Sequence, residues 1–424
     1  MALMDIRPSR TLSYVTVKLI FVNRYFAPDI SATSQLLTEL AQHLAGTGRE
    51  VHVVTSRQLY DDARAQLPHR ETMDRVHVHR VWTTRFGRSG LAGRSIDYLT
   101  FYFSVGIALD RMADAGDVIV AETDPPLVSV VAAWVARRRN ARLVNWLQDI
   151  FPEVAERLGV GILAGWLGSV FRKLRDYSLR AASANVVLGD LMAETLRRTQ
   201  ATDEARITVI HNWSDGRLIR PGSSDRNPLR REWGLSRKFV VGYSGNMGRA
   251  HEVETIVRAA ERLRGVPDIA FLIIGGGKNQ AWLEAEVERR GLGASFQFHG
   301  YQPRERLAES LGASDVHLVS LKPELEGLIV PSKFYGIAAA GRPTLFIGDR
   351  NGEIPRILDE ADCGLSFSVG DDAGLSRAIE ALRHDSGRVG LMGANARQAF
   401  ERRFDKPRAM TQWDELLSRV AEAS

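Results

Sequence analysis

Cysteine is nearly absent from this sequence, and its scarcity excludes two kinds of site. Cys363 is the only cysteine among 424 residues, so neither an intramolecular disulfide nor a cysteine-rich zinc site can form. The histidines include no His-x-x-x-His pair, and His77 and His79 alternate along a strand-like segment, as surface residues do. We therefore expect no resident metal, and a reducing, cytoplasmic compartment.

Apolar runs long enough to cross a membrane are also missing. The longest, Tyr98 to Leu109 and Leu127 to Ala136, fall short of the roughly 20 residues that a membrane-spanning helix needs. Residues 1–16 have no apolar core of the signal-peptide type, and we predict that they form a disordered extension. Any membrane contact is therefore expected to be peripheral, at the inner face of the plasma membrane.

Neither sign of charge dominates, since 56 basic residues stand against 51 acidic ones. Basic residues nevertheless cluster, most clearly in Arg137–Arg139 and Arg172–Arg175. Such clusters are typical of solvated helix faces, but they also suit anionic lipid head groups or phosphorylated substrates. No nucleic-acid-binding module accompanies them, so nucleic acid is not an expected partner.

The sequence does contain a regular alternation of strand-like apolar runs and amphipathic helical segments. The first strand, Lys18–Asn23, is followed by a helical stripe from Leu36 to Leu44 and by a second strand, Val51–Thr55. Such alternation is typical of parallel sheets whose two faces are covered by helices. Further strands are expected at Val76–Trp82, Asp117–Ala121, Arg142–Leu147, Ala184–Leu188, Ile207–Ile210, Ala270–Ile274, Phe296–His299, Val316–Leu321, Thr344–Ile347 and Leu365–Val369.

A polar, turn-rich stretch from Asp215 to Pro228 divides this alternation into two halves. We therefore predict an α/β fold with two facing Rossmann-like domains, at residues 17–214 and 215–403. A C-terminal helix at 404–424 is expected to pack back on the first domain. Because ligands of such sheets bind beyond the carboxyl ends of the strands, the two domains would share one interdomain cleft.

The loop after the strand at Phe239–Tyr243 has the composition of an anion-binding turn. Gly245 can adopt positive φ and lets the backbone approach a ligand closely. Asn246, Arg249 and His251 supply side-chain donors. A tight strand-to-helix turn without a ligand is the alternative interpretation.

A second loop of this kind leads into the helix expected to start at Pro331. Pro331 suits the first helical position, Ser332 offers a hydroxyl, and Lys333 adds a cation beside free backbone N–H groups. A diphosphate would fit there, although an ordinary helix with a solvated lysine explains the same residues. Two such loops in one half of the chain favour the diphosphate.

Short motifs follow one another along most of the chain: Val22–Asp29, Gln148–Glu153, Ile210–Trp213, Tyr243–Arg249, Ile274–Gly277, Phe298–Tyr301 and Pro331–Pro343. In content and order they resemble a family-4 glycosyltransferase of the GT-B fold, of the subgroup linked to colanic acid, capsule and O-antigen assembly. The resemblance covers nearly all of residues 17–403.

The resemblance implies that the C-terminal domain binds a nucleotide sugar as co-substrate. The N-terminal domain would bind a glycan or a polyprenyl-diphosphate-linked acceptor. Transfer would retain the anomeric configuration without a cofactor or protein-bound metal, and no Asp-x-Asp motif stands in a suitable loop. Lys333 would neutralise the departing diphosphate as a catalytic residue. The donor site would also contain Gly245, Asn246, Arg249, Ser332 and Gly275.

Two departures from the family pattern concern charge. The usual arginine and lysine of the first C-terminal loop align with Asn246 and His251. Part of the phosphate charge would then be neutralised by Lys333, by Arg249 or by a protonated His251.

The family's Glu-x7-Glu pattern is also broken. Gly336 takes the place of the second glutamate, and Glu326 lies two residues from the expected first position. Glu326 is a candidate catalytic residue that binds sugar hydroxyls, or else a solvated loop acid. Glu353 is a further candidate for donor binding, or a helix cap.

In the N-terminal domain, Ser31, Ala32 and Thr33 replace the family's glycine pair, so hydroxyl contacts to the acceptor would partly replace backbone contacts. Asp149 aligns with a residue near the reacting sugar and is assigned to substrate positioning or proton transfer, with helix capping as the alternative. The aromatic and arginine-containing segment Phe86–Phe103 suits a membrane surface that carries a lipid-linked acceptor, unless its aromatics are buried in the core.

These features predict an enzyme, a hexosyltransferase that acts in cell-surface polysaccharide assembly. It would move a hexose or amino-hexose, with UDP as the expected nucleotide, to a lipid-linked or oligosaccharide acceptor. Two alternatives stay open. One is a non-hydrolysing nucleotide-sugar epimerase of similar architecture, and the other is a degenerate scaffold that binds a sugar nucleotide.

Overall fold

The computed structural model describes residues 17–86, 90–161 and 165–423, so the extension predicted at 1–16 lies outside the described residues. The chain divides into two compact units. The first contains the described residues up to Val120, together with Trp134–Arg142 and the chain from Val420 onward. The second contains Ala121–Ala133 and Leu143–Arg419. The predicted domain boundary at residue 214 stays a prediction.

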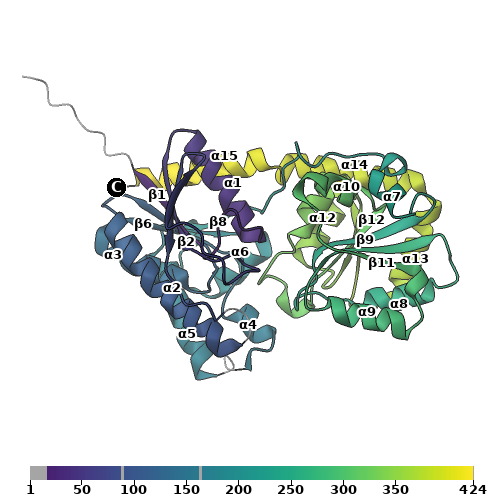
Figure 1. The fold of residues 1–424 in the computed structure, drawn as a ribbon, viewed down its shortest axis with the longest axis horizontal. Coiled ribbons are helices and arrows are strands. Elements are labelled where there is room, and N and C mark those ends of the chain that lie inside the picture. The colour runs from purple at the N-terminus through teal and green to yellow at the C-terminus, as the bar shows by residue number, and fades with distance from the viewer. Residues whose placement is uncertain (1–16, 87–89, 162–164, 424) are drawn as a thin grey trace, which may run out of the picture. The chain divides into compact units, whose positions relative to one another are not determined.

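An eight-stranded sheet contains the strands of the first half of the chain, in the order β3-β4-β2-β1-β5-β6-β7-β8 (Figure 1). Its strands are β1 (Lys18–Val22), β2 (Glu50–Ser56), β3 (Arg70–Met73), β4 (Val76–Val81), β5 (Val118–Ala121), β6 (Arg142–Trp146), β7 (Ala184–Val187) and β8 (Ile207–Val209). The helices of this half are α1 (Ala32–Gly46), α2 (Leu91–Met112), α3 (Val128–Arg139), α4 (Glu153–Arg157), α5 (Trp166–Ala181) and α6 (Asp190–Arg198).

The central strands of this sheet are mostly apolar because both of their faces are covered. Every residue of β5 and β7 is buried, which is typical of parallel strands between helical layers. Strand β3 differs, because it lies at the edge and pairs antiparallel with β4. Its residues alternate between exposed and half-buried, and no apolar run marks it, so the sequence did not predict it.

A six-stranded sheet contains the strands of the second half, in the order β11-β10-β9-β12-β13-β14. Its strands are β9 (Phe239–Asn246), β10 (Ile269–Gly276), β11 (Phe296–His299), β12 (Val316–Ser320), β13 (Thr344–Ile347) and β14 (Gly364–Phe367). The helices are α7 (Pro228–Glu232), α8 (Glu254–Arg262), α9 (Gln280–Arg289), α10 (Leu307–Gly312), α11 (Lys333–Ala339), α12 (Glu353–Ala361), α13 (Asp372–His384), α14 (Ser386–Arg403) and α15 (Lys406–Glu422).

Alternate residues of the six-stranded sheet point to helices on its two faces. On one face, Val241 and Phe271 belong to a core cluster that also contains residues of α8, α9 and α13. On the other face, Val240 and Leu272 pack with Leu229 of α7. Figure 1 shows α8 and α9 on one side of the sheet and α7 and α10 on the other. The sheet is therefore the middle layer of an α/β sandwich, as predicted.

The strand order of this sheet explains where a ligand can bind. Strand β9 pairs with β10 on one side and with β12 on the other, both parallel. The chain therefore leaves β9 toward one edge of the sheet and β12 toward the opposite edge. Such a switch point opens a crevice at the carboxyl ends of the two strands, which is where ligands of doubly wound sheets bind. The loop that carries His251 and the loop that leads to Lys333 both start at this point.

Candidate active site

Lys333 lies at the centre of the candidate site and is the first residue of α11. Its Nζ is 2.9 Å from Nε2 of His251 and 5.3 Å from the ring centre of Tyr243. A methyl group placed on Gly245 would lie 3.2 Å from Cε of Lys333, so the lysine stem runs directly over the glycine. Three residues assigned to the donor site, Lys333, His251 and Gly245, are thus brought together. Helix α11 begins two residues after Pro331, the predicted first helical position.

Glycine is required where β9 and β10 end. Gly245 has φ +112° and Gly275 has φ +129°, values that side-chain-bearing residues rarely adopt. The two residues are paired across the strands, and a Cβ on Gly275 would lie only 2.5 Å from the carbonyl oxygen of Gly245. The absence of a side chain at Gly275 lets the two strand ends pair, and its absence at Gly245 leaves the space that Lys333 occupies.

The positive charge of Lys333 is not balanced by a carboxylate. Among the described residues, no acidic group forms an ion pair with it, and its hydrogen-bond partner is His251. Burial lowers the pKa of Lys333 from 10.5 to about 7. A buried cation without a counter-charge is costly, and a bound anion removes that cost. The site can therefore bind an anionic group at Nζ.

His251 holds the lysine in place as a neutral ring. Its Nδ1 donates to the backbone oxygen of Ser320 at 2.6 Å, so Nε2 carries the lone pair that accepts from Lys333. Burial, and then the neighbouring Lys333 charge, lower the pKa of His251 to about 3. The structure therefore does not support the protonated His251 that was considered from the sequence, because a second cation there would repel the ammonium group.

The remaining residues assigned to the donor site lie on two loops and differ in how they are held. Asn246 and Arg249 are exposed, and no ion pair of Arg249 occurs among the described residues. Ser332 is exposed at the N-cap of α11, and its hydroxyl makes no capping hydrogen bond. Asn279, which the sequence did not single out, fixes the loop by donating to the backbone oxygens of Gly248 and His251. Arg249 is thus an exposed cation without an ion pair, on the loop that carries His251.

Glu326 and Glu353 bind backbone N–H groups in this structure. Oε1 of Glu326 accepts from the N–H of Glu353 at 2.8 Å, at the start of α12. Glu353 in turn accepts from Asp190 and Leu191, at 3.2 and 2.9 Å, in the first turn of α6. Burial raises the pKa of both carboxyl groups, that of Glu326 to about 7. Glu353 therefore caps α6, a helix far from it in sequence.

Asp149 lies just beyond β6, beside the segment that leads to Lys333. It forms a β-bridge with Ile329, and the N–H of Ile150 donates to the oxygen of Leu328 at 3.0 Å. Oδ1 of Asp149 is buried and has no hydrogen-bond partner among the described residues. Burial, and then the charge of Asp124, raise the pKa of Asp149 to about 7. The carboxyl group can therefore exchange a proton near neutral pH.

Glu122 is a second buried carboxyl group in this region that sequence reasoning missed. It follows β5, and one of its oxygens accepts from Gln148 at 3.2 Å while the other has no described partner. Burial, and then the charge of Asp124, raise the pKa of Glu122 well above its usual value. Its position at the carboxyl end of a predicted strand is the signal that could have found it.

The acceptor candidates lie at the start of α1. Ser31 is its N-cap residue, and Ala32 and Thr33 form its first turn, which contains no acidic residue. Both the N–H and the hydroxyl of Ser31 donate to Oδ1 of Asp29. The Ser31 hydroxyl is therefore already engaged within the first unit, and its contact with an acceptor stays a prediction.

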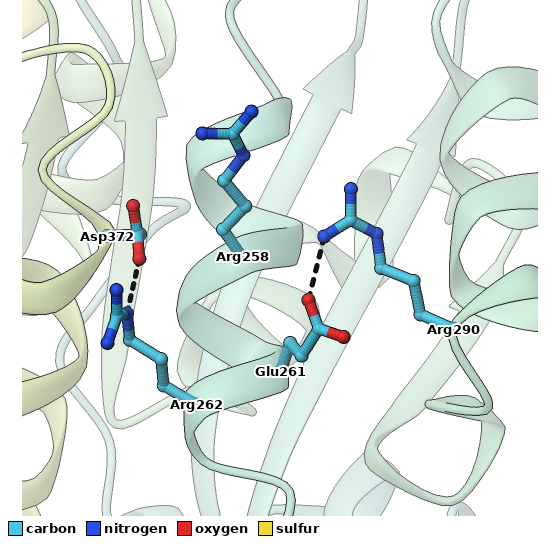
Figure 2. Close-up of a pocket in the computed structure, with 5 residues that line it drawn as sticks. All are labelled: Arg258, Glu261, Arg262, Arg290 and Asp372. Carbon is cyan, nitrogen blue, oxygen red and sulfur yellow. Dashed lines mark hydrogen bonds and ion pairs between the residues drawn. The ribbon is translucent and has the colours of Figure 1, made fainter.

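A surface cavity of about 560 Å³ lies elsewhere and contains none of the predicted site residues (Figure 2). It is lined by Arg258, Glu261, Arg262, Arg290 and Asp372. Arg262 pairs with Asp372, and Nη1 of Arg290 lies 2.8 Å from Glu261, as the dashed lines in Figure 2 show. Its charges largely neutralise one another, unlike the charge of Lys333.

Two features are absent from the part of the chain that the structure describes. Within residues 17–86, 90–161 and 165–423, no three His, Cys, Asp or Glu side chains are grouped so that they could bind a metal ion. In the same ranges, no helix combines the length and apolar character needed to cross a bilayer.

Two family models match consecutive parts of the chain. Residues 32–213 match the glycosyl transferase 4-like domain, and residues 225–399 match glycosyl transferases group 1. The chain is 24% identical over 428 residues to the putative colanic acid biosynthesis glycosyl transferase WcaI of Escherichia coli (strain K12), covering 94% of this chain and 98% of that protein. It is 28% identical over 303 residues to the probable glycosyltransferase WbjE of Pseudomonas aeruginosa, covering 70% and 74% of the two chains.

A solved structure shows the same fold. Anabaena Alr3699/HepE in complex with UDP superposes with a TM-score of 0.70 at 17% identity, covering 95% of this chain and all of that one. Together with the two family models, the paired α/β sheets confirm the predicted fold and enzyme class. The chain belongs to glycosyltransferase family 4 and is a nucleotide-sugar-dependent glycosyltransferase of the hexosyltransferase class, with the GT-B fold.

Proposed function

We propose that this enzyme transfers a hexose or amino-hexose from a UDP-linked donor to a lipid-linked or oligosaccharide acceptor in cell-surface polysaccharide assembly, with retention of configuration. The observation that carries the proposal is the half-buried ammonium group of Lys333 above Gly245, which has no carboxylate partner among the described residues. A diphosphate is the anion that a nucleotide-sugar donor brings to such a site. Two similar proteins support the proposal, since WcaI is described as a putative colanic acid biosynthesis glycosyl transferase and HepE was solved with UDP.

The chemistry follows from where charge develops. Breaking the bond between the sugar and the diphosphate builds negative charge on the departing nucleotide. Lys333 is already held by His251, so its ammonium group need not reorganise when that charge appears. Arg249, which is exposed on the loop that carries His251, supplies a second cation. The reaction requires no metal in this scheme because the two side chains and the exposed loop N–H groups neutralise the diphosphate.

Asp149 and Glu326 are proposed to act on the sugars. Each has a pKa near 7, so each can donate or accept a hydrogen bond at neutral pH. Asp149 is the candidate for positioning the acceptor hydroxyl or accepting its proton, because one of its oxygens is unpartnered. Glu326 is the candidate for binding donor hydroxyls through the oxygen that does not cap α12.

Replacement of Lys333 by alanine tests the proposed donor site. We expect Lys333→Ala to lower transferase turnover by at least about a hundredfold, the scale seen when one group that stabilises a developing charge is removed. Lys173→Ala, on the exposed side of α5, is the matched control and should keep full activity. Full activity of Lys333→Ala would refute the site.

A donor screen and a donor-only incubation test the remaining steps. UDP should raise the melting temperature more than GDP or TDP, because a ligand that binds only the folded state stabilises it. Nucleotide release should require acceptor. Isomerisation of the donor sugar without acceptor would instead indicate the epimerase, and donor binding without transfer to any acceptor would indicate the scaffold. The family assignment already argues against both.

A further inference from the structure

Helix α2 has an apolar stripe on its exposed side. Ile96, Leu99, Phe103 and Ile107 are all exposed, Leu99 to 65% and Phe103 to 70%. Their spacing of three and four residues places them on one face of the helix, along about 16 Å of its length. Large apolar side chains that are exposed singly are ordinary, but a continuous row of them marks an interaction surface.

This stripe is not needed to hold α2 on the sheet. The opposite face of the helix has its own row, formed by Asp97, Phe101, Val105 and Leu109, and each of these is buried. From the sequence, the aromatics of Phe86–Phe103 suited either a membrane surface or the core. The structure divides them, because Phe101 is fully buried and Phe103 is largely exposed.

A cationic border adjoins the C-terminal end of the stripe. Asp110, three residues after Ile107, accepts hydrogen bonds from Arg138 and Arg139 of α3, which lies beside α2 in Figure 1. Arg111 and Arg137 are also exposed. The four arginines outweigh Asp110. Lys18 is shared by the neighbouring Asp114 and Asp117, so the border as a whole has a net charge of +2.

Trp134 extends the same surface on α3. It lies one helical turn before Arg138, whose guanidinium is 5.8 Å from its ring centre, and it is 53% exposed. Tryptophan and arginine side by side are favourable where a bilayer changes from apolar chains to anionic head groups. The first unit thus presents an apolar row, an interfacial aromatic and a cationic border within itself.

We propose that this surface, the α2 stripe with Trp134 and the adjoining arginines, docks the enzyme on an anionic lipid bilayer. The apolar row would enter the head-group region while the arginines bind lipid phosphates. The inference deepens the proposed function, because it places the enzyme where a lipid-linked acceptor is found. It rests on α2 and α3 alone and not on the diphosphate site.

A second copy of the chain is the less suitable occupant. In a two-fold dimer both copies would bring the same arginine border to the contact, and neither would add negative charge to balance it. A single-helix stripe is also narrow compared with the roughly 800 Å² per partner that stable interfaces bury. Anionic lipid supplies the negative charge that balances the arginines.

Vesicle sedimentation with the full chain tests the proposal. The protein should sediment with vesicles of equal parts phosphatidylglycerol and phosphatidylcholine, and much less with phosphatidylcholine alone. The double variant Leu99→Ser/Phe103→Ser should reduce binding by about tenfold or more. Arg138→Gln should weaken binding to the anionic vesicles and make that binding less sensitive to salt concentration. The control Trp282→Ser/Leu391→Ser removes exposed apolar side chains on α9 and α14 and should bind as the wild type does.

The results for two variants distinguish a failure of this proposal from a failure of the proposed donor site. Leu99→Ser/Phe103→Ser should keep its affinity for UDP and its melting temperature, whereas Lys333→Ala should keep its vesicle binding. Unchanged vesicle binding by the stripe variant, or an equal loss in the control, would overturn the proposal. So would light scattering that shows a wild-type dimer and a monomeric stripe variant, because the stripe would then be a contact between copies.

Discussion

The positive charge of Lys333 is poorly balanced by its surroundings. Burial lowers its pKa to about 7, and its hydrogen-bond partner, His251, is neutral. A diphosphate beside Nζ adds negative charge and so raises that pKa. Donor binding and protonation of Lys333 are therefore coupled, and the free enzyme takes up a proton when the donor binds above neutral pH.

This coupling predicts a pH dependence of donor binding. Because the protonated lysine binds the diphosphate, the affinity for UDP should fall as the pH rises from 7 to 9, by up to about tenfold per unit. Calorimetric titration of UDP into the enzyme at both pH values measures it. Lys333→Met should bind weakly with a much smaller dependence, and a wild-type profile as flat as that of the variant would contradict the coupling.

Glu326 is expected to make the stability of the folded state depend on pH. Burial raises its pKa from 4.5 in the unfolded chain to about 7 in the folded one. Between these values the folded state holds a proton that the unfolded state releases. The stability contributed by this proton is therefore fully present below about pH 4.5 and is lost as the pH rises to about 7.

Substitution by glutamine isolates this effect. Glu326→Gln keeps an oxygen for the N–H of Glu353 but cannot ionise. Relative to the wild type, its free energy of unfolding should increase by an amount on the order of 1–3 kcal/mol between pH 5 and pH 8. Urea unfolding at both pH values measures the difference. Glu324→Gln, at an exposed neighbour, should show no such trend, and a parallel response of the two variants would count against the assignment.

Some of the residue contacts were predictable and others were not. Gly245 and Lys333 were expected at one site because each follows a strand, and strand ends of a parallel sheet share an edge. The hydrogen bond between Lys333 and His251 depends on the paths of two loops, which no local pattern determines. Glu353 was considered as a possible cap, but its contact with α6 joins residues more than 160 positions apart.

Among the elements, the turn at the end of β9 shows how backbone conformation makes room for chemistry. Gly245 has φ +112°, and the space of its missing side chain is taken by the stem of Lys333. A side chain at this position would strain the backbone and push against Cε of the lysine. The turn therefore positions the cation as well as exposing N–H groups.

Gly245→Ala should accordingly affect both stability and binding. We expect a loss of about 1–2 kcal/mol in the free energy of unfolding, from the disfavoured φ, and weaker UDP binding because Lys333 is displaced. Gly265→Ala is the control, because open space surrounds Gly265 and its φ is not positive. Denaturant titration and calorimetry measure the two effects. An alanine variant as stable and as tight-binding as the control would show that the contact is unimportant.

Elements with strong apolar patterns were predicted and weakly patterned ones were not. The buried runs of β5, β6 and β7 matched their predicted ranges to within about one or two residues, because both faces of these strands require apolar side chains. Edge strand β3 has one exposed face and no such run. Helix α2 has apolar rows on two faces, and its sequence did not indicate which row is buried, since that is decided by its packing.

For the molecule as a whole, strand order connects the fold to its function. The sequence predicted two α/β sheets, and the structure contains one of eight strands and one of six. In the six-stranded sheet, the chain changes direction between β9 and β12, so the loops that carry His251 and Lys333 meet. Alternation of strands and helices indicated the class of fold, but strand order is a property of the assembled sheet.

A crystal structure of the enzyme with UDP tests the central claim most directly. The account predicts that Nζ of Lys333 lies within about 3 Å of a diphosphate oxygen, with the phosphates beside the turn at Gly245 and the guanidinium of Arg249 turned toward them. UDP bound elsewhere, for example at the arginine-lined cavity of Figure 2, with Lys333 still held only by His251, would contradict it.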